Sequence, residues 1–303
     1  MLYKKYNALI LTLLIITILL QISCSNPLLT ENGLSKLPPS SDQNEEEYDI
    51  NGCGQGNGLP PVEKAEDEPA EPPEPPRVGL YSGRGSWETD VSAFSNFFEQ
   101  YGYPCSYFDE TDAVEMDLAA QFDLICFPGG FAAEYKNYIK NHDNIRLFVE
   151  DGGLFMGVCA GAYYACDILK WQGVDNPYPL GFFDGKGVGP LSGLVGWGET
   201  TAINLNSEHP FNNSFDQVLE MYYFDGPYFE PYAGTAVEVL ARYDVNGEPS
   251  IIAGSFGEGA YLLFGPHPEL GGYSPSSPEF NLEGGEGARW PWLHSVLTWF
   301  SGW

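Results

Sequence analysis

The chain has little positive charge. It contains 13 Lys and Arg against 42 Asp and Glu, which gives a formal net charge of -29 at pH 7 and a pI near 4.1. A surface this acidic repels the phosphates of nucleic acids and anionic lipid headgroups, although solubility alone also accounts for such a charge. We therefore expect no nucleic-acid partner. The hydrophobic fraction of 43% is ordinary for a chain that buries a core, so disorder throughout is excluded.

Motifs for metals and phosphates are also missing. The sequence has no Cys-x-x-Cys pair, so a zinc knuckle or a thioredoxin-like site has no support. The glycines of residues 52–58 resemble a phosphate loop only superficially, because no Lys-Ser/Thr follows them and no strand precedes them. We expect neither a metal site nor a cofactor.

The N-terminus has the pattern of a secretory signal. Lys4 and Lys5 precede an almost unbroken apolar run over residues 8–20, which is followed by polar Gln21 and then by Cys24. The run is shorter than the roughly 20 apolar residues that span a bilayer comfortably, although a retained N-terminal anchor is an alternative.

The end of this leader, Ile22-Ser23-Cys24, resembles the lipobox of bacterial lipoproteins. It departs from that pattern at Gln21, where lipoboxes usually carry Leu. The resemblance implies a signal peptide over residues 1–24, lipid on Cys24, and an extracytoplasmic protein anchored to the membrane, on the cell surface or the periplasmic side.

Residues 25–76 are rich in Pro, Glu, Asp, Ser and Gly and end in Glu68-Pro-Ala-Glu-Pro-Pro-Glu-Pro-Pro76. Such a segment cannot bury enough apolar area to offset its conformational entropy. We expect a disordered acidic tether that Pro stiffens and charge repulsion extends.

Six cysteines in an exported chain raise the question of disulfides. If one cysteine carries lipid and another is a nucleophile, four remain, with three possible pairings between which the sequence does not choose. Two of these four lie in apolar patterns and could equally be small buried thiols. The four are Cys53, Cys105, Cys126 and Cys166, of which the last two are the candidates for burial.

From residue 77 to residue 303 the pattern changes to alternating strands and helices. Short apolar runs that end in Gly-rich turns predict strands, and apolar residues at helical spacing predict helices. The predicted strands are Val78–Tyr81, Pro104–Phe108, Leu124–Phe127 and Leu154–Val158, and the predicted helices are Val91–Tyr101, one containing Ile145–Val149, and Ala160–Leu169. This order is typical of a flavodoxin-like, doubly wound and mostly parallel sheet flanked by helices, in one α/β domain.

The second half of the domain is richer in β-structure. We expect strands at Ala236–Tyr243, Ser250–Ser255 and Ala260–Phe264, joined by Gly-containing hairpin turns, and a final helix at Trp290–Phe300 whose aromatic residues pack in the core. The segment Tyr222–Phe229 is either an aromatic core strand followed by a turn or the lining of a pocket.

The stretch Gly157-Val-Cys-Ala-Gly161 lies where a predicted strand meets a predicted helix. Glycines two places before and after a residue allow a sharp, strained turn in which side chains would otherwise clash. Such a turn exposes the residue at the carboxyl edge of the sheet, near the positive end of a helix that stabilises a thiolate. The alternative is a tight turn around a buried thiol. We predict that Cys159 is a nucleophile.

Two further motifs fit this nucleophile. The turn Pro128-Gly129-Gly130 ends an earlier strand, and its open amides could bind an oxyanion together with the amide of Ala160. His267, just past a strand and two residues before Glu269, suits a base and the carboxylate that orients it. Among the other histidines, His142, His209 and His294, only His209, next to Glu208, is a rival.

These three motifs, Phe127-Pro-Gly-Gly130, Gly157-Val-Cys-Ala-Gly-Ala-Tyr163 and Gly265-Pro-His-Pro-Glu269, resemble those of class I glutamine amidotransferases. Within that superfamily they look most like the domain at the N-terminus of some biotin-protein ligases. The resemblance covers residues 78–303. It implies Cys159 as nucleophile, His267 as base, Glu269 as orienter, and Gly130 and Ala160 as oxyanion donors.

The chain lacks the synthetase domain, the ATP motif and the biotin-ligase catalytic region that would use such a domain. We therefore expect thiol-dependent hydrolysis of an amide, peptide or ester, with an unknown small-molecule or peptide substrate whose selection falls to residues 173–198. A catalytically silent binding or scaffold module and a glutaminase-type amidotransferase subunit are the alternatives.

Overall fold

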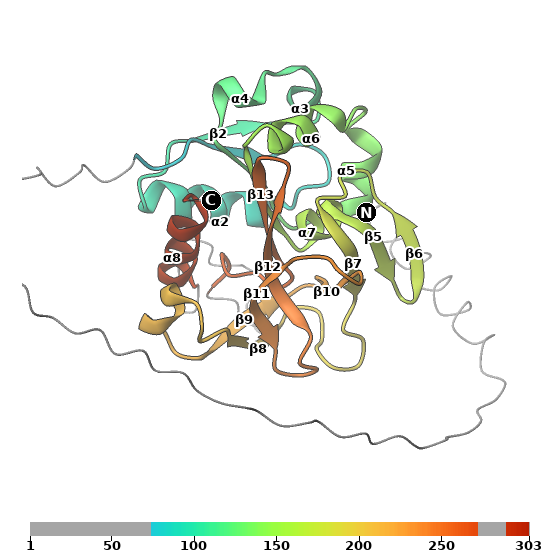
Figure 1. Ribbon diagram of the computed structural model, residues 1–303, viewed down its shortest axis with the longest axis vertical. Coiled ribbons are helices and arrows are strands. Elements are labelled where there is room, and N and C mark those ends of the chain that lie inside the picture. The colour runs from blue at the N-terminus through green and yellow to red at the C-terminus, as the bar shows by residue number, and fades with distance from the viewer. Residues whose placement is uncertain (1–73, 272–288, 303) are drawn as a thin grey trace, which may run out of the picture. The chain divides into compact units, whose positions relative to one another are not determined.

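The computed structural model describes residues 74–271 and 289–302 (Figure 1). Within these residues, two sheets and the helices around them form an α/β fold. The predicted signal peptide, Cys24, Cys53, the glycines of residues 52–58 and nearly all of the predicted tether lie outside the described residues. No helix in the described part of the chain is long and apolar enough to cross a membrane.

The larger sheet has nine strands in the order β2-β1-β3-β4-β13-β12-β11-β8-β9. The first five are parallel to one another, as the prediction of a mostly parallel sheet requires, and the remaining strands are antiparallel. In that order they are Cys105–Phe108, Val78–Tyr81, Leu124–Phe127, Leu154–Val158, Gly259–Phe264, Pro249–Phe256, Glu238–Tyr243, Glu199–Leu205 and Val218–Tyr223.

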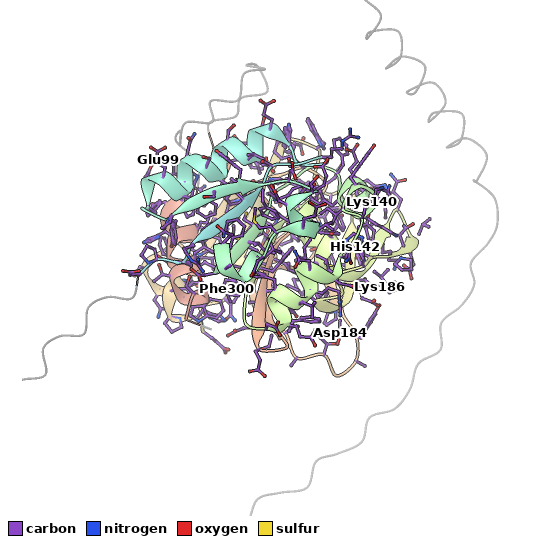
Figure 2. All side chains as sticks on the ribbon, turned by 90° about the horizontal axis from the view of Figure 1, so that it is seen from above. Glu99, Lys140, His142, Asp184, Lys186 and Phe300 are labelled. Carbon is purple, nitrogen blue, oxygen red and sulfur yellow. The ribbon has the colours of Figure 1, made fainter. Side chains whose placement is uncertain are left out.

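The central parallel strands are buried on both faces, which is why they read as unbroken apolar runs. Alternate residues enter two different cores. Leu154, Met156 and Val158 of β4 pack with α2 (Glu88–Gln100) and α8 (Trp290–Phe300), whereas Phe155 packs on the opposite side. The helices on that second side are α3 (Asp112–Glu115), α4 (Leu118–Gln121), α5 (Ala132–Tyr138), α6 (Asp143–Glu150) and α7 (Ala160–Ala165). Charged side chains such as Glu99 and Lys140 lie on the outside (Figure 2).

The second sheet has four strands in the order β10-β7-β5-β6, which are Tyr228–Pro231, Phe183–Gly189, Cys166–Trp171 and Val174–Pro177. A short 3-10 helix, η1 (Pro210–Ser214), lies between β8 and β9. The prediction of a β-rich second half is thus confirmed, although the sequence analysis did not predict the individual strands β5, β6 and β7.

The predicted helix at Ala160–Leu169 is wrong in its second half. The helix ends at Ala165, and residues from Cys166 onward form β5, which pairs with β7 and β6. Apolar residues at helical spacing are also compatible with a half-buried strand, and pairing with distant strands decides between the two. The predicted strands of the first half, the predicted helices at Val91–Tyr101 and Ile145–Val149, and the C-terminal core helix match α2, α6, α8 and the strands given above within a few residues.

Candidate active site

Cys159 lies between the last residue of β4 and the first residue of α7, at the carboxyl edge of the parallel sheet. Its backbone has φ 50° and ψ -101°, a conformation that residues other than glycine rarely adopt. The side chain is 5% exposed, and its thiol donates a hydrogen bond to the carbonyl of Phe224 at 3.4 Å. The backbone geometry is that of a nucleophile elbow. The predicted exposure of the residue is wrong, because the thiol is buried as in the alternative, although it lines a cavity.

The two glycines that flank the elbow are required by close packing. A Cβ on Gly157 would lie 2.6 Å from the carbonyl group of Gly161, and a Cβ on Gly161 would overlap the carbonyl oxygen of Phe127 in the neighbouring strand. The Gly-x-Cys-x-Gly spacing therefore lets β4, the turn and the first turn of α7 approach one another without side chains between them.

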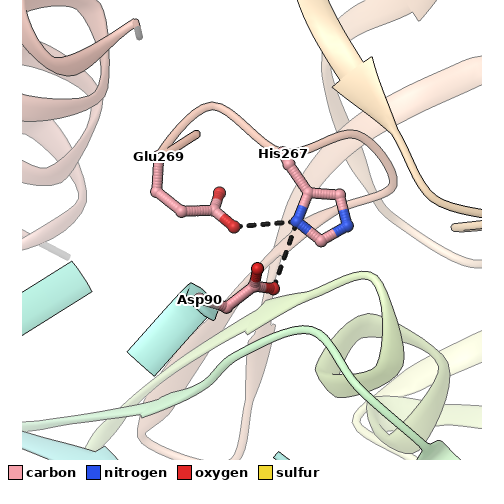
Figure 3. Close-up of side chains that lie close together, drawn as sticks. All are labelled: Asp90, His267 and Glu269. Carbon is pink, nitrogen blue, oxygen red and sulfur yellow. Dashed lines mark hydrogen bonds and ion pairs between the residues drawn. The ribbon is translucent and has the colours of Figure 1, made fainter. Parts of the chain in front are cut away.

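His267 is 1% exposed and lies beyond β13, next to the end of β9. Its amide donates to the carbonyl of Tyr222 at 2.9 Å, which fixes the backbone. Its Nδ1 lies 2.8 Å from Oε1 of Glu269 and 3.2 Å from Oδ2 of Asp90, a residue near the start of α2 (Figure 3). The predicted pair His267–Glu269 is therefore formed, with an additional carboxylate at the same nitrogen.

Burial and charge act in opposite directions on this group. Burial alone lowers the pKa of His267, but the charges of Asp90 and Glu269, together with contacts to Asp90 and Cys159, raise it well above its usual value. Burial raises the pKa of Glu269 to about 7, with a further increase from Asp90 and an opposing effect from His267. The two carboxyl groups therefore favour the charged form of the imidazole.

The two ring nitrogens of His267 have different surroundings. Nδ1 faces both carboxyl groups, whereas Nε2 is buried without a hydrogen-bond partner among the described residues. Cys159 also contributes to the raised pKa of the ring. Proton transfer during acyl chemistry requires a thiol and an oriented imidazole that interact, and Cys159 and His267 are two such groups.

The predicted oxyanion donors lie beside Cys159. Gly130 and Ala160 both line the cavity that contains the thiol. The backbone amides on either side of these donors are hydrogen-bonded: that of Cys159 donates to the carbonyl of Phe264, and that of Phe131 donates to the carbonyl of Gly85. Among the described residues, no turn or loop carbonyl accepts the amide of Gly130 or Ala160. Two open amides at one thiol could stabilise an oxyanion.

The cavity at Cys159 has a volume of about 600 Å³, within the range of sites for drug-sized ligands. Its walls come from α5 and the turn before it, from α7, from the second sheet and from the end of β9. Its lining is largely aromatic, with Lys136 and Asp225 as its charged side chains. The aromatic residues are Phe131, Tyr163, Trp171, Tyr178, Trp197 and Phe224.

Residues 173–198 and the segment Tyr222–Phe229 both contribute to the lining of this cavity. Asn176, Tyr178 and Trp197 come from residues 173–198, the segment expected to select the substrate. In the segment Tyr222–Phe229 both alternatives apply: Tyr223 is a core residue of β9, whereas Phe224 and Asp225 line the cavity.

The other histidines have other neighbours. His209, the rival base, lies 2.9 Å from Glu238 rather than pairing with Glu208, and its ring packs on Phe211. The Nδ1 atoms of His142 and His294 lie within hydrogen-bond distance of tyrosine hydroxyls. The lining of the cavity at Cys159 includes none of these three histidines, nor His267, which differs from them in its interaction with Cys159.

The described cysteines are all free. Cys126 and Cys166 are buried, as the alternative to a disulfide predicted, Cys105 is half-buried and Cys159 lies in the elbow. Burial raises the pKa of Cys105 to about 11 and that of Cys126 well above the usual value.

Sequence reasoning missed Asp90. It follows a predicted turn and stands three residues after Trp87, where an acidic residue is also explained by the positive end of a helix. The donor atoms of Asp90, His267 and Glu269 lie within 4.8 Å of one another, as in a three-ligand metal site. However, the direct hydrogen bond between His267 and Glu269 occupies the space between two of the donors.

The fold and the elbow define the class of this protein as a glutamine amidotransferase-like α/β domain. The crystal structure of a glutamine amidotransferase matches 75% of this chain and 99% of its own, with a TM-score of 0.52 and 18% identity. At that identity the likeness shows the fold alone.

Within that class, the chain belongs to the family described as biotin-protein ligase, N terminal, whose model matches residues 78–286. An uncharacterized protein of Chlamydia muridarum is 29% identical over 156 residues, 48% of this chain and 60% of the relative. Phosphoribosylformylglycinamidine synthase subunit PurQ of Rhodopseudomonas palustris strain BisB18 is 26% identical over 188 residues. The match covers 51% of this chain and 73% of the PurQ subunit. Biotin–protein ligase of Schizosaccharomyces pombe is 26% identical over 181 residues. That match covers 55% of this chain and 29% of the ligase. The match thus spans less than two thirds of the Chlamydia relative and of the ligase.

Proposed function

We propose that this domain is a thiol-dependent acyl hydrolase. The observation that carries the proposal is the strained backbone of Cys159 at the wall of a cavity, next to an imidazole that is oriented through its other nitrogen. Cys159 is the nucleophile, His267 the base and Glu269 the carboxylate that orients it.

The reaction follows from these positions. His267 Nε2 holds the proton of the thiol in a thiolate–imidazolium pair before the sulfur attacks the substrate carbonyl, and the amides of Gly130 and Ala160 stabilise the oxyanion. The imidazolium then protonates the departing amine or alcohol, and an acyl-enzyme remains on Cys159. Water, activated by the same imidazole, hydrolyses the thioester and restores the thiol.

The cavity supports an acyl donor larger than glutamine. A volume of about 600 Å³ lined by aromatic rings exceeds what one amino-acid side chain fills, and flat apolar walls suit planar or apolar substrate faces. We propose an amide, peptide or ester with such a face as the substrate, and the second sheet and residues 173–198 as the source of selectivity.

We also propose that the chain is exported and lipidated on Cys24, with residues 25–76 as a tether and the membrane as its partner. The motifs of residues 1–24 support this proposal. Processing that is blocked by globomycin would support it, whereas recovery of a tagged chain in the cytoplasm would contradict it.

The second candidate is a glutaminase-type amidotransferase subunit, which the similarity to the PurQ subunit favours. A third candidate, a silent binding module, predicts no turnover. The full chain should be assayed for release of product from aryl esters, peptide anilides and glutamine, with Cys159→Ala as control. Turnover of an ester or anilide that depends on Cys159 supports a hydrolase. Turnover of glutamine alone supports the subunit, and no turnover supports the binding module.

A further inference from the structure

Asp90 places a second carboxylate at the nitrogen of His267 that already pairs with Glu269. Its Oδ2 lies 3.2 Å from Nδ1, against 2.8 Å for Oε1 of Glu269, and the two carboxylates approach the ring from different elements (Figure 3). Asp90 belongs to α2, at the opposite end of the domain sequence from His267.

The burial of Asp90 calls for an explanation. Its side chain is 0% exposed, and a buried carboxylate is unfavourable unless it is paired. Among the residues that the structure describes, Asp90 forms one ion pair, with His267, and neither of its carboxylate oxygens accepts a hydrogen bond. It does not cap α2 with its side chain either. The interaction that accounts for its position is therefore with the imidazole.

The backbone around Asp90 is arranged to admit it. A Cβ on Gly129 would overlap Oδ2 of Asp90 and lie 2.6 Å from Cε1 of His267. The amide of Trp87, just before α2, donates to the carbonyl of Gly129 at 2.9 Å and fixes the start of the helix against this turn. The turn that carries the Gly130 amide thus also makes room for the carboxylate.

We propose that Asp90 is a positioning residue that, together with Glu269, holds His267 in the orientation and charge state needed to serve Cys159. This inference rests on the proposed function. The titratable groups that act on the imidazole are Asp90, Glu269 and Cys159, and the carboxyl groups of the first two face Nδ1.

Asp90 stabilises the imidazolium during the reaction. When the thiol proton moves to Nε2, the ring gains a positive charge that both carboxylates attract. The sulfur forms the bond to the acyl carbon, and the proton on Nε2 leaves with the amine or alcohol. A thiolate–imidazolium pair is the resting state that such a site favours.

The test is the rate at which iodoacetate alkylates Cys159 in the full chain, measured by mass spectrometry of its peptide between pH 5 and pH 10, because this anionic reagent reacts fastest while the imidazolium is charged. In wild type, we expect the rapid reaction of the thiolate–imidazolium pair up to the raised pKa of His267. In Asp90→Asn, which keeps the size of the side chain, this alkaline limit should fall by at least about one pH unit, because an opposite charge at this distance is worth about one to three pKa units. Glu88→Gln removes an exposed carboxylate from the first turn of the same helix and should leave the profile unchanged.

The outcomes separate the two proposals. A wild-type Cys159 that reacts no faster than an ordinary thiol contradicts the proposed function. A fast wild type with an unchanged profile in Asp90→Asn overturns the role of Asp90 alone. If Asp90→Asn does not fold, Glu269→Gln provides the test. Because Asp90 is still in place, the alkaline limit of Cys159 alkylation should remain above the pKa of an ordinary histidine. A fall of this limit to the ordinary value contradicts the inference. Loss of the wild-type profile on adding a chelator would show that the three side chains bind a metal, and would also overturn it.

Discussion

The buried carboxyl of Glu269 predicts a specific dependence of stability on pH. Burial raises its pKa from 4.5 to about 7. A carboxyl with a pKa that is higher in the folded than in the unfolded state stabilises the fold fully below about pH 4.5, and this contribution is lost as the pH rises through about 7. The difference in pKa corresponds to about 3 kcal/mol over the whole range, most of which falls between pH 5 and pH 8.

Glu269→Gln tests this value because Gln resembles the protonated side chain and does not titrate. Equilibrium denaturation in guanidinium, followed by tryptophan fluorescence, gives the free energy of unfolding of the full chain and the variant. The lower limit is pH 5, since the pI is near 4.1. We expect the stability of the variant relative to wild type to increase by about 2 to 3 kcal/mol from pH 5 to pH 8.

The matched control is Glu88→Gln, in which an exposed carboxylate of α2 is lost. Its stability relative to wild type should change little over the same pH range. If the difference between Glu269→Gln and wild type stays constant within about 0.5 kcal/mol, Glu269 does not hold its proton to neutral pH, and the electrostatic reasoning about the site is wrong.

Three further predictions follow from the packing. Gly161→Ala should destabilise the fold by about 3 kcal/mol or more, because the new Cβ overlaps a strand carbonyl. The control Gly302→Ala, whose Cβ has its nearest contact at 3.4 Å, should cost well under about 1 kcal/mol. Equal effects of the two changes in thermal unfolding would contradict the elbow geometry. Trp197→Ala, at a side chain that is 60% exposed and lines the cavity, should slow labelling of the nucleophile by a bulky aromatic probe about fivefold but leave iodoacetamide unaffected, and an equal effect on both reagents would argue against a substrate wall. Cys126 and Cys166, both buried, should resist alkylation in the native chain and react only after unfolding, as counted by intact mass; rapid native labelling of either would show that this part of the core opens.

The first half of the sheet could be predicted because each strand is a short apolar run that a Gly-rich turn ends. Leu124–Phe127 and Leu154–Val158 are buried on both faces, so their sequences contain no polar residue to confuse the pattern. The elbow could be predicted for the same local reason, since Gly157 and Gly161 are required by contacts within a few residues and with the adjacent strand.

The second sheet and Asp90 could not be predicted because they depend on distant pairing. Residues 166–171 satisfy a helical as well as a strand pattern, and hydrogen bonds to β6 and β7 decide the outcome. Asp90 is an ordinary acidic residue of a first helical turn until α2 packs against the turn at Gly129 and brings it to His267. The pair His267 and Glu269 could be predicted because only Pro268 separates them in the sequence, although their roles remain predictions.

The central claim is that Cys159 is a nucleophile activated by His267. The most direct measurement is covalent labelling of the full chain by an alkyne-tagged acyloxymethyl ketone, with the modified peptide identified by mass spectrometry. We expect stoichiometric labelling of Cys159 in wild type, none at this position in Cys159→Ala, and labelling at least about 100-fold slower in His267→Ala. Equal labelling rates in wild type and His267→Ala would contradict the claim.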